Sequence, residues 1–209
     1  MIRTSFPTVK NGQPVRRSRN SSRRNPVTVK VAPRTGRLAC LAGQHVLVIA
    51  DCQNLDMGAA NLDLSVDWKR LGQTLANVAC SISRHAFICE PAGRTRQHDY
   101  FARSGWTPHS KLSRNVRSRN KVVGNKNTDH LMAFFAGVLV SRSQATLVLI
   151  ASGDGDLVED LSEAIGMLPS PRPVATLSIA GSTSHRLDAR HSRFVIDNVE
   201  LGRDCLRPS

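Results

Sequence analysis

Carboxylate and amide side chains follow two apolar runs of the sequence, at the point where each run ends. The run 45–51 (His-Val-Leu-Val-Ile-Ala-Asp) closes on Asp51, and Asn54 follows three residues later. The run 146–152 leads into Ser-Gly-Asp-Gly-Asp at 152–156. Nearly continuous apolar runs are typical of buried parallel strands, whose carboxyl ends meet at one edge of a sheet. We therefore expect the two polar clusters to lie together.

Asp129 opens a further apolar segment that is predicted to be helical, and the start of such a helix can face the same edge of the sheet. Three or four carboxylates gathered there repel one another. The usual resolution is a hard divalent cation such as Mg²⁺ or Mn²⁺, bound by oxygen ligands and several waters. Such an ion activates water and stabilises phosphoryl charge. The expected metal ligands are Asp51, Asp129 and Asp154, with Asp156 nearby.

Each of these residues also has a plain structural interpretation. Asp51 can simply end its strand, Asn54 can cap a helix or form a turn, and Asp129 can accompany a helix N-cap. The segment 152–156 is harder to explain in this way, because its two glycines exceed what a strand-to-helix turn needs. The sequence contains neither a GxxxxGK[ST] phosphate loop nor a GxGxxG motif.

Strand-like and helix-like segments alternate along the chain. Strands are predicted at 45–51, 81–89, 146–152 and 173–180, helices at 64–78, 128–139 and 154–168, a short strand and turn within 99–111, a loop at 114–126, and a last short element at 194–201. This alternation indicates an α/β protein with a central, mainly parallel sheet flanked by helices in three layers.

Three motifs, in this order, resemble the NYN family of PIN-like nucleases, which includes the LabA-like proteins. They are Ile-Ala-Asp-Cys-Gln-Asn-Leu at 49–55, Lys-Asn-Thr-Asp at 126–129 and Leu-Ile-Ala-Ser-Gly-Asp-Gly-Asp-Leu at 149–157. A small-residue segment at 180–187 resembles a later loop of the family. The resemblance spans residues 45–201 and implies a PIN-like α/β fold with metal-dependent ribonuclease activity.

The resemblance also implies which residues form the site. The acidic catalytic residues that it implies are Asp51, Asp129, Asp154 and Asp156, and the supporting polar residues are Asn54 and Ser152. Many family members carry a second acid six residues after the helix-opening one, where this sequence has Phe135. Two functions stay open: a ribonuclease that hydrolyses RNA phosphodiester bonds with Mg²⁺ or Mn²⁺, and a catalytically weakened RNA-binding module of the same fold.

The net charge of +13 is concentrated in two segments. Residues 1–44 contain ten basic and no acidic residues, and residues 93–126 contain nine basic residues and one acid. Basic segments attract phosphate backbones, so the expected partner is RNA, single-stranded or structured. The expected nucleic-acid-binding residues are Arg94, Arg96, Arg103, Lys111, Arg114, Arg117, Arg119, Lys121 and Lys126. Tyr100, Phe101 and Trp106 lie among them, and they either stack on unpaired bases or belong to the core.

The sequence predicts a basic, disordered tail at 1–44, an NYN/PIN-like domain at 45–201 and a short tail at 202–209. An organelle transit peptide is the alternative for the first segment. No apolar run approaches the ~20 residues of a membrane-spanning helix, and residues 1–30 lack the apolar core of a secretory signal. The five cysteines form no CxxC pair, which disfavours a disulfide framework or zinc site and favours free thiols. The expected location is the cytoplasm.

Overall fold

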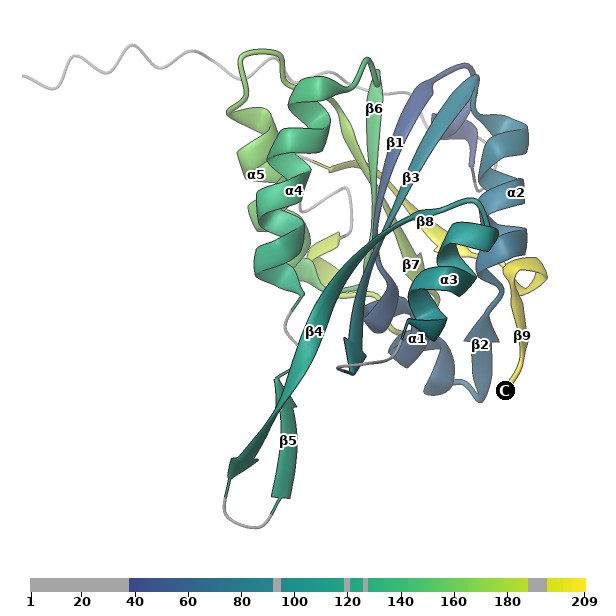
Figure 1. Ribbon diagram of the computed structural model, residues 1–209. Helices are drawn as coiled ribbons and strands as arrows, with labels where there is room; N and C mark the ends of the chain where they lie inside the picture. The colour runs from purple at the N-terminus through teal and green to yellow at the C-terminus, as the bar shows by residue number, and fades with distance from the viewer. Residues whose placement is uncertain (1–37, 92–94, 119–120, 126–127, 188–194) are drawn as a thin grey trace, which may run out of the picture. The chain divides into compact units, whose positions relative to one another are not determined.

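A seven-stranded sheet forms the centre of the structure, a computed structural model that describes residues 38–91, 95–118, 121–125, 128–187 and 195–209. Of residues 91, 112–118 and 121–125 only the backbone is described. The strands are β1 (His45–Asp51), β3 (Ser81–Pro91), β4 (Thr107–Ser118), β5 (Lys121–Asn125), β6 (Leu147–Ala151), β7 (Val174–Ile179) and β8 (Val195–Leu201). Their order across the sheet is β5-β4-β3-β1-β6-β7-β8, with β5 antiparallel to β4 and the other neighbours parallel (Figure 1).

The central strands form where the sequence is almost continuously apolar. β1 and β6 pair from Val46–Leu147 to Ala50–Ala151, and all ten of these residues are buried. Successive side chains of a strand point to opposite faces, so alternate residues of β1 enter two separate apolar clusters. A strand that is buried on both faces needs an apolar residue at every position, which explains the uninterrupted runs.

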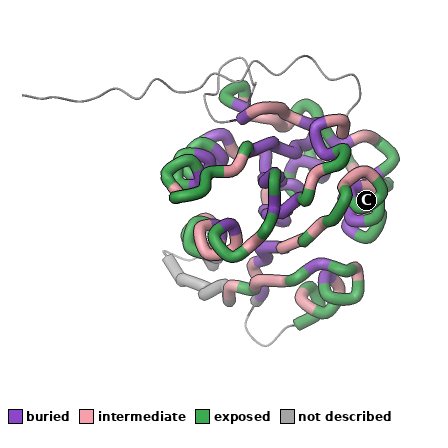
Figure 2. The backbone as a smooth tube through the Cα atoms, turned by 90° about the horizontal axis from the view of Figure 1, so that it is seen from above, coloured by how far each residue is buried: buried purple, intermediate pink, exposed green. Residues whose placement is uncertain are grey.

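Helices cover both faces of the sheet. On one face lie α4 (Asp129–Arg142) and α5 (Gly155–Gly166), and on the other lie α1 (Cys52–Ala60), α2 (Trp68–Val78) and α3 (Arg96–Arg103) (Figure 1). The most deeply buried residues lie along the sheet between these helices (Figure 2). The prediction of a three-layer α/β fold with a mainly parallel sheet is confirmed.

The strand order reverses direction next to β1, the strand from which the chain builds the sheet outward on both sides. From β1 the chain builds β3 and β4 on one side, and later β6, β7 and β8 on the other. In open parallel sheets, ligands bind outside the carboxyl ends at the point where the strand order reverses. That point lies here between β1 and β6, the two strands that precede the polar clusters.

Several element predictions need correction. The helix predicted at 64–78 begins only at Trp68, where the Asp67 side chain accepts a hydrogen bond from the Arg70 N–H at 2.9 Å and caps it. Residues Leu64–Val66 instead form β2, which pairs antiparallel with β9 (Leu206–Pro208). Helices α1 and α3 were not predicted. Because α3 occupies residues 96–103, the short strand expected within 99–111 begins only at Thr107.

The loop predicted at 114–126 is a β-hairpin over its described residues. β4 runs on to Ser118, and β5 pairs with it from Arg114–Asn125 to Ser118–Lys121. The hairpin extends away from the sheet in Figure 1, beyond the helices that cover the other strands. Backbone hydrogen bonds pair the two strands, which is an arrangement that apolar periodicity in the sequence does not reveal.

The structured chain also extends past the predicted domain limits of 45 and 201. Before β1, the 3-10 helix η1 (Ala39–Leu41) buries Cys40 and Leu41 in the core. After β8, η3 (Arg203–Cys205) buries Cys205, and β9 follows it. The remainder of the predicted tail, residues 1–37, lies outside the described residues. All five cysteines are free thiols, as expected. None of the described helices has the length and apolarity that crossing a membrane requires.

Candidate active site

The turn after β6 and the first turn of α1 are joined by one side chain. Asn54 Oδ1 accepts a hydrogen bond from the Gly153 N–H at 2.7 Å. Within the turn, Ser152 is fully buried and its Oγ accepts a hydrogen bond from the Asp154 N–H at 3.2 Å. The predicted supporting residues Asn54 and Ser152 thus fix the strand ends that carry Asp51 and Asp154.

Asp51 and Asp154 each cap the helix that follows their strand. Asp51 Oδ1 accepts from the Asn54 N–H at 3.2 Å at the start of α1. Asp154 Oδ1 accepts from the N–H groups of Asp156 and Leu157 at 3.0 and 3.4 Å at the start of α5. The structural interpretation is therefore correct in that both acids have a structural role, and both cap a helix. A carboxylate has about four acceptor positions, so capping leaves capacity for a cation.

Three carboxylates interact at this edge of the sheet. Asp51 is only 5% exposed, and this burial raises its pKa to about 6. The negative charges of Asp129, at the start of α4, and of Asp154 contribute to this raised pKa, while hydrogen bonds from the backbone of Asn54 and Gln53 oppose the rise. The three residues predicted to bind the metal, from β1, α4 and the turn after β6, therefore lie near enough for their charges to interact.

An aromatic cluster borders Asp51. Its register partner on β3 is Phe87, whose ring centroid lies 6.2 Å from that of Phe135 on α4 and 4.7 Å from that of His109 on β4. Phe135 also lies 4.8 Å from His109. Phe135, which replaces an acid of the resembled family, therefore packs against the sheet beside the carboxylates.

A pair of histidines extends this cluster along β3 and β4. His85 Nδ1 and His109 Nε2 are 2.9 Å apart, and burial lowers the pKa of both imidazoles, that of His85 to about 4. The proximity of His109 lowers the pKa of His85 further. The histidines are therefore neutral at physiological pH and add no cation to the site.

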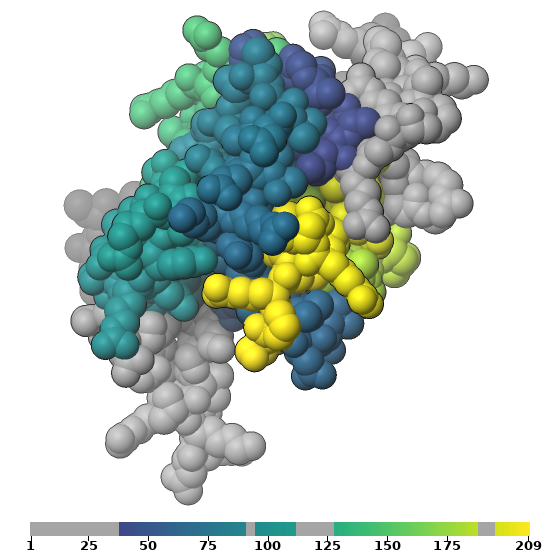
Figure 3. Space-filling view, turned by 90° about the vertical axis from the view of Figure 1, so that its right-hand side faces the viewer, coloured from purple at the N-terminus to yellow at the C-terminus, as the bar shows by residue number. Residues whose placement is uncertain are grey.

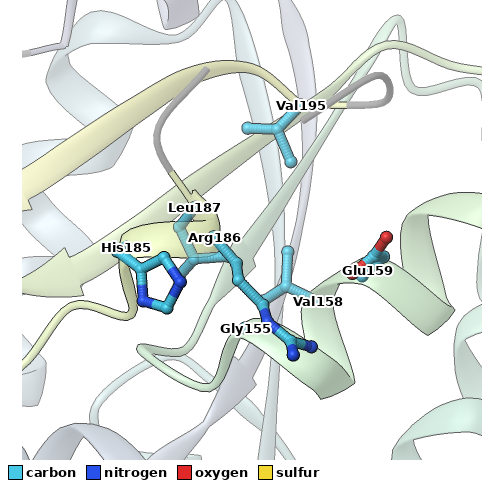
Figure 4. Close-up of a pocket in the computed structure, with 7 residues that line it drawn as sticks. All are labelled: Gly155, Val158, Glu159, His185, Arg186, Leu187 and Val195. Carbon is cyan, nitrogen blue, oxygen red and sulfur yellow. The ribbon is translucent and has the colours of Figure 1, made fainter. Parts of the chain in front are cut away.

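Asp156 takes a different partner. It is exposed on the first turn of α5 and forms an ion pair with Arg186 of η2 (His185–Leu187). Figure 4 shows Arg186 extending beside Gly155 at the start of α5, where η2 and α5 line a cavity of about 290 Å³. Arg186 was not predicted as a site residue, and the sequence indicated only the small-residue segment 180–187 in which it lies. The catalytic role of Asp156 stays a prediction.

A second cavity of about 500 Å³ lies between the turn after β6 and the loop after β7. Its lining is almost entirely polar: Asn54, Gly153, Asp154, Gly155, Asp156, Gly181, Ser182, Thr183, Ser184 and Arg186. The loop is held close by a hydrogen bond from the Ser184 N–H to the Gly153 carbonyl at 3.1 Å. The small-residue segment at 180–187 therefore packs directly on the carboxylate-bearing turn.

Replacing Gly153 with alanine is expected to lower the free energy of unfolding by about 1–3 kcal/mol. A Cβ atom there would lie 2.9 Å from the carbonyl oxygen of Ser182 and 3.2 Å from Asn54 Oδ1, so the loop must move. Chemical denaturation measures the change. The control is Gly137→Ala in α4, where a Cβ meets nothing within 4 Å and helix propensity should add about 0.5–1 kcal/mol. Effects of the same sign in both variants would contradict this packing.

The predicted RNA-binding aromatic residues divide into two groups. Phe101 and Trp106 are each 3% exposed and pack edge-on against Trp68, with ring centroids 5.1 and 5.3 Å away. The core interpretation is therefore correct for these two, and base stacking is wrong. Tyr100 is half-buried and lines a groove beside α1.

The predicted nucleic-acid-binding cations lie on α3 and the β4–β5 hairpin, or outside the described residues. Arg96 and Arg103 are exposed on α3, and Lys111 is half-buried on β4. The backbone of Arg114, Arg117 and Lys121 lies in the hairpin. Arg94, Arg119 and Lys126 are outside the described residues.

Direct ligation of a metal ion requires several oxygen, nitrogen or sulfur side chains within reach of one point. In the described part of the chain, no group of three or more His, Cys, Asp or Glu side chains is close enough together to hold one ion directly. The interaction of Asp51 with Asp129 and Asp154 is thus one of charges at longer range. Asp56 of α1, which also lines the groove beside Tyr100, is another acid that the motifs did not indicate.

Comparison with known proteins bears on the fold. The chain matches no family model and no curated protein. It is similar to the crystal structure of VPA0982, a protein of unknown function from Vibrio parahaemolyticus RIMD 2210633, with a TM-score of 0.61 and 18% sequence identity over 79% of this chain and 97% of that one. At 18% identity, this similarity shows a shared fold and nothing more.

Proposed function

We propose that the protein is a divalent-metal-dependent ribonuclease of the PIN-like type that hydrolyses RNA phosphodiester bonds. The observation that carries the proposal is that Asp129 and Asp154 lie near enough to Asp51, a buried carboxyl at the carboxyl edge of a parallel sheet, for their charges to raise its pKa. Perturbed carboxyl groups in such a place are typical of catalytic sites. The basic residues of the sequence fit a polyanionic substrate, and the cytoplasm is the proposed location.

The carboxylates suit Mg²⁺ or Mn²⁺ in their chemistry. All three offer oxygen donors, and the repulsion between them favours a cation. Mg²⁺ commonly keeps several waters and takes one or two protein carboxylates together with substrate phosphates. A hydrated ion of this kind does not need three carboxylates in direct contact. Asp51, Asp129 and Asp154 are the residues that would hold it, through water where they do not reach it.

The other residues of the site position the carboxylates and the RNA. A bound ion would supply an activated water and neutralise charge on the phosphate. Asn54 and Ser152 hold the turn that presents Asp154, through hydrogen bonds to the N–H groups of Gly153 and Asp154. Exposed cations on α3, Arg96 and Arg103, attract the phosphate backbone.

The direct test uses the full chain and a 5′-labelled single-stranded RNA with Mg²⁺, Mn²⁺ or EDTA. Cleavage with either ion and none with EDTA supports the proposal. Binding of RNA without cleavage at any concentration of either ion would favour the second candidate, a catalytically weakened RNA-binding module. The observation that favours this second candidate is the Phe135 ring where the resembled family has an acid.

Replacing Phe135 with aspartate is expected to lower the Mg²⁺ concentration for half-maximal cleavage several-fold. The new carboxylate would stand beside Phe87, the register partner of Asp51, and add a fourth charge to attract the ion. Losing the packed ring should cost about 3–5 kcal/mol of stability. Cleavage across a Mg²⁺ titration, below the melting temperature of the variant, measures the effect.

The matched control is Phe134→Asp. Phe134 is 69% exposed and its ring lies 5.5 Å from that of Phe135, so its substitution adds the same charge to α4 with a smaller loss of packing. We expect its Mg²⁺ dependence and melting temperature to stay close to those of the wild type. An equal Mg²⁺ response in both variants would mean that position 135 has no privileged access to the site.

A further inference from the structure

A groove of about 710 Å³ lies on the side of α1 opposite Asn54. Residues from α1, β2, β3, α3 and the C-terminal segment line it. In Figure 3 the C-terminal segment, in yellow, lies on this face between the teal segment that includes α3 and the blue segment that includes α1 and β2. The groove is larger and more apolar than the polar cavity at the carboxylate turn.

Helix α1 connects the groove to the acidic cluster. Its residues Cys52, Gln53, Asp56, Met57 and Ala60 line the groove, a spacing that belongs to one face of a helix. The opposite side of the helix carries Asn54, bonded to Gly153, and Gly58, which packs against Ser182 and Ile179. Asp51 caps the same helix, so the groove begins within one residue of the acidic cluster.

The lining combines flat and flexible apolar groups with hydrogen-bonding groups. Tyr100 is half-buried on one wall, and Met57, 59% exposed, lies on another. The buried Ile88 contributes an apolar floor. Such surfaces take up the faces of unpaired bases, whose Watson–Crick edges are then read by polar side chains.

Asp56 places a carboxylate in the lining of the groove. The Trp68 Nε1–H donates to Asp56 Oδ1 at 3.0 Å, which holds the carboxylate in the wall of the groove. Asp56 is exposed at the groove, and partial desolvation raises its pKa to about 6, with Trp68 and Arg207 opposing the rise. The carboxylate is therefore ionised at pH 7.5. An ionised carboxylate only accepts hydrogen bonds, and one indole donor leaves acceptor capacity for a ligand.

We infer that this groove binds a guanine base of the RNA, with Asp56 accepting hydrogen bonds from the guanine N1–H and N2–H. Guanine presents two adjacent N–H donors on its Watson–Crick edge, whereas adenine and cytosine each present one amino group and uracil one imino N–H between two acceptors. An acceptor-only side chain therefore favours guanine over the other three bases. That the guanine belongs to an RNA strand rests on the proposed function.

Arg207 adds a place for the phosphate of the same nucleotide. Its Nε donates to Ser65 Oγ at 3.2 Å, and both residues line the groove. A guanidinium has five N–H donors, so this bond leaves others for a phosphate. A 5′-nucleotide is therefore a suitable minimal probe.

The test measures binding of 5′-GMP, 5′-AMP, 5′-CMP and 5′-UMP to the full chain by calorimetry at pH 7.5 in EDTA. We expect GMP to bind at least about 10-fold more tightly than the others, since a bidentate base contact is worth about 1–3 kcal/mol. Asp56→Asn keeps an acceptor for Trp68 but replaces the second oxygen with a donor. It should weaken GMP about 10-fold and leave the other nucleotides within about 2-fold.

Three further variants separate contact with the base from loss of fold. Met57→Ala should weaken all four nucleotides several-fold, because it removes a stacking surface that does not distinguish bases. Met167→Ala is its control, since Met167 is 73% exposed on the C-terminal end of α5. Asp160→Asn, exposed on α5, is the control for the change of charge at Asp56.

GMP binding no tighter than UMP binding, or unchanged in Asp56→Asn, would overturn the inference. Because the measurement needs neither a metal nor cleavage, its outcome is independent of the proposed activity. A protein that cleaves RNA but does not prefer GMP keeps the proposed function and loses the guanine site. A protein that prefers GMP but cleaves no RNA keeps the guanine site and loses the function.

Discussion

Replacing Asp154 with asparagine is expected to reduce RNA cleavage at least about 100-fold. The change removes one of the three charges that would hold the cation, and metal stabilisation of transition-state charge is worth several kcal/mol. Asparagine is as good an N-cap as aspartate, so the start of α5 should stay intact. Initial rates on a labelled RNA at saturating Mg²⁺ or Mn²⁺ measure the effect.

Asp160→Asn provides the control for this experiment. It removes one negative charge from an exposed position of the same helix and should leave the rate within about 2-fold of the wild type. Thermal melting of both variants verifies the fold. Cleavage by Asp154→Asn at the wild-type rate would show that the carboxylate cluster is not the catalytic site.

Replacing Asp51 with asparagine is expected to stabilise the protein by up to about 3 kcal/mol at pH 7.5 in EDTA. Burial, together with the charges of Asp129 and Asp154, raises the pKa of Asp51 from 3.8 to about 6. The folded state therefore binds the proton more tightly than the unfolded state does, and it loses stability as the pH rises between these two values. A difference of about two pH units corresponds to about 3 kcal/mol.

The same linkage gives the pH dependence of the effect. Below pH 3.8 Asp51 is protonated in both states, so wild type and variant should be equally stable. The advantage of the variant should grow through pH 4–6 and reach its full size above pH 7. Urea denaturation at pH 4, 5, 6 and 7.5 measures it, with Asp160→Asn expected to change stability by no more than about 0.5 kcal/mol. A variant less stable than the wild type at pH 7.5 would mean that the cap bond to Asn54 outweighs the cost of burying the charge.

The strands of the core were predictable because their burial demands apolar residues at every position. This holds for 45–51 and 146–152, and the order of these runs alone predicts Asp51 and Asp154 at one edge of the sheet. The convergence of Asp129 with them was expected from the predicted helix start and from the family resemblance. What could not be predicted was the distance between the carboxylates.

Other features were hidden because distant contacts create them. The strand at Leu64–Val66 exists because residues 206–208 pair with it, so local periodicity extended the neighbouring helix over it. Among the described helices none covers the β4–β5 hairpin, and its pairing rests on backbone hydrogen bonds that local periodicity does not reveal. Arg186 meets Asp156 through the loop after β7, and the groove needs α1, α3 and the C-terminal segment together. None of these arrangements leaves a local signature.

Helix α1 separates the groove from the carboxylate turn and contacts both. One side forms a wall of the groove, the other holds Asn54 against the carboxylate turn, and its cap is Asp51. A ligand that shifts this nine-residue helix from the groove side also shifts Asp51, and an ion that draws Asp51 toward Asp154 also moves the groove wall. Linkage requires such an influence to be mutual, so the factor by which GMP changes Mn²⁺ affinity equals the factor by which Mn²⁺ changes GMP affinity. If the guanine site and the metal site both exist as proposed, α1 is the route by which recognition of a base and retention of the cation would regulate each other.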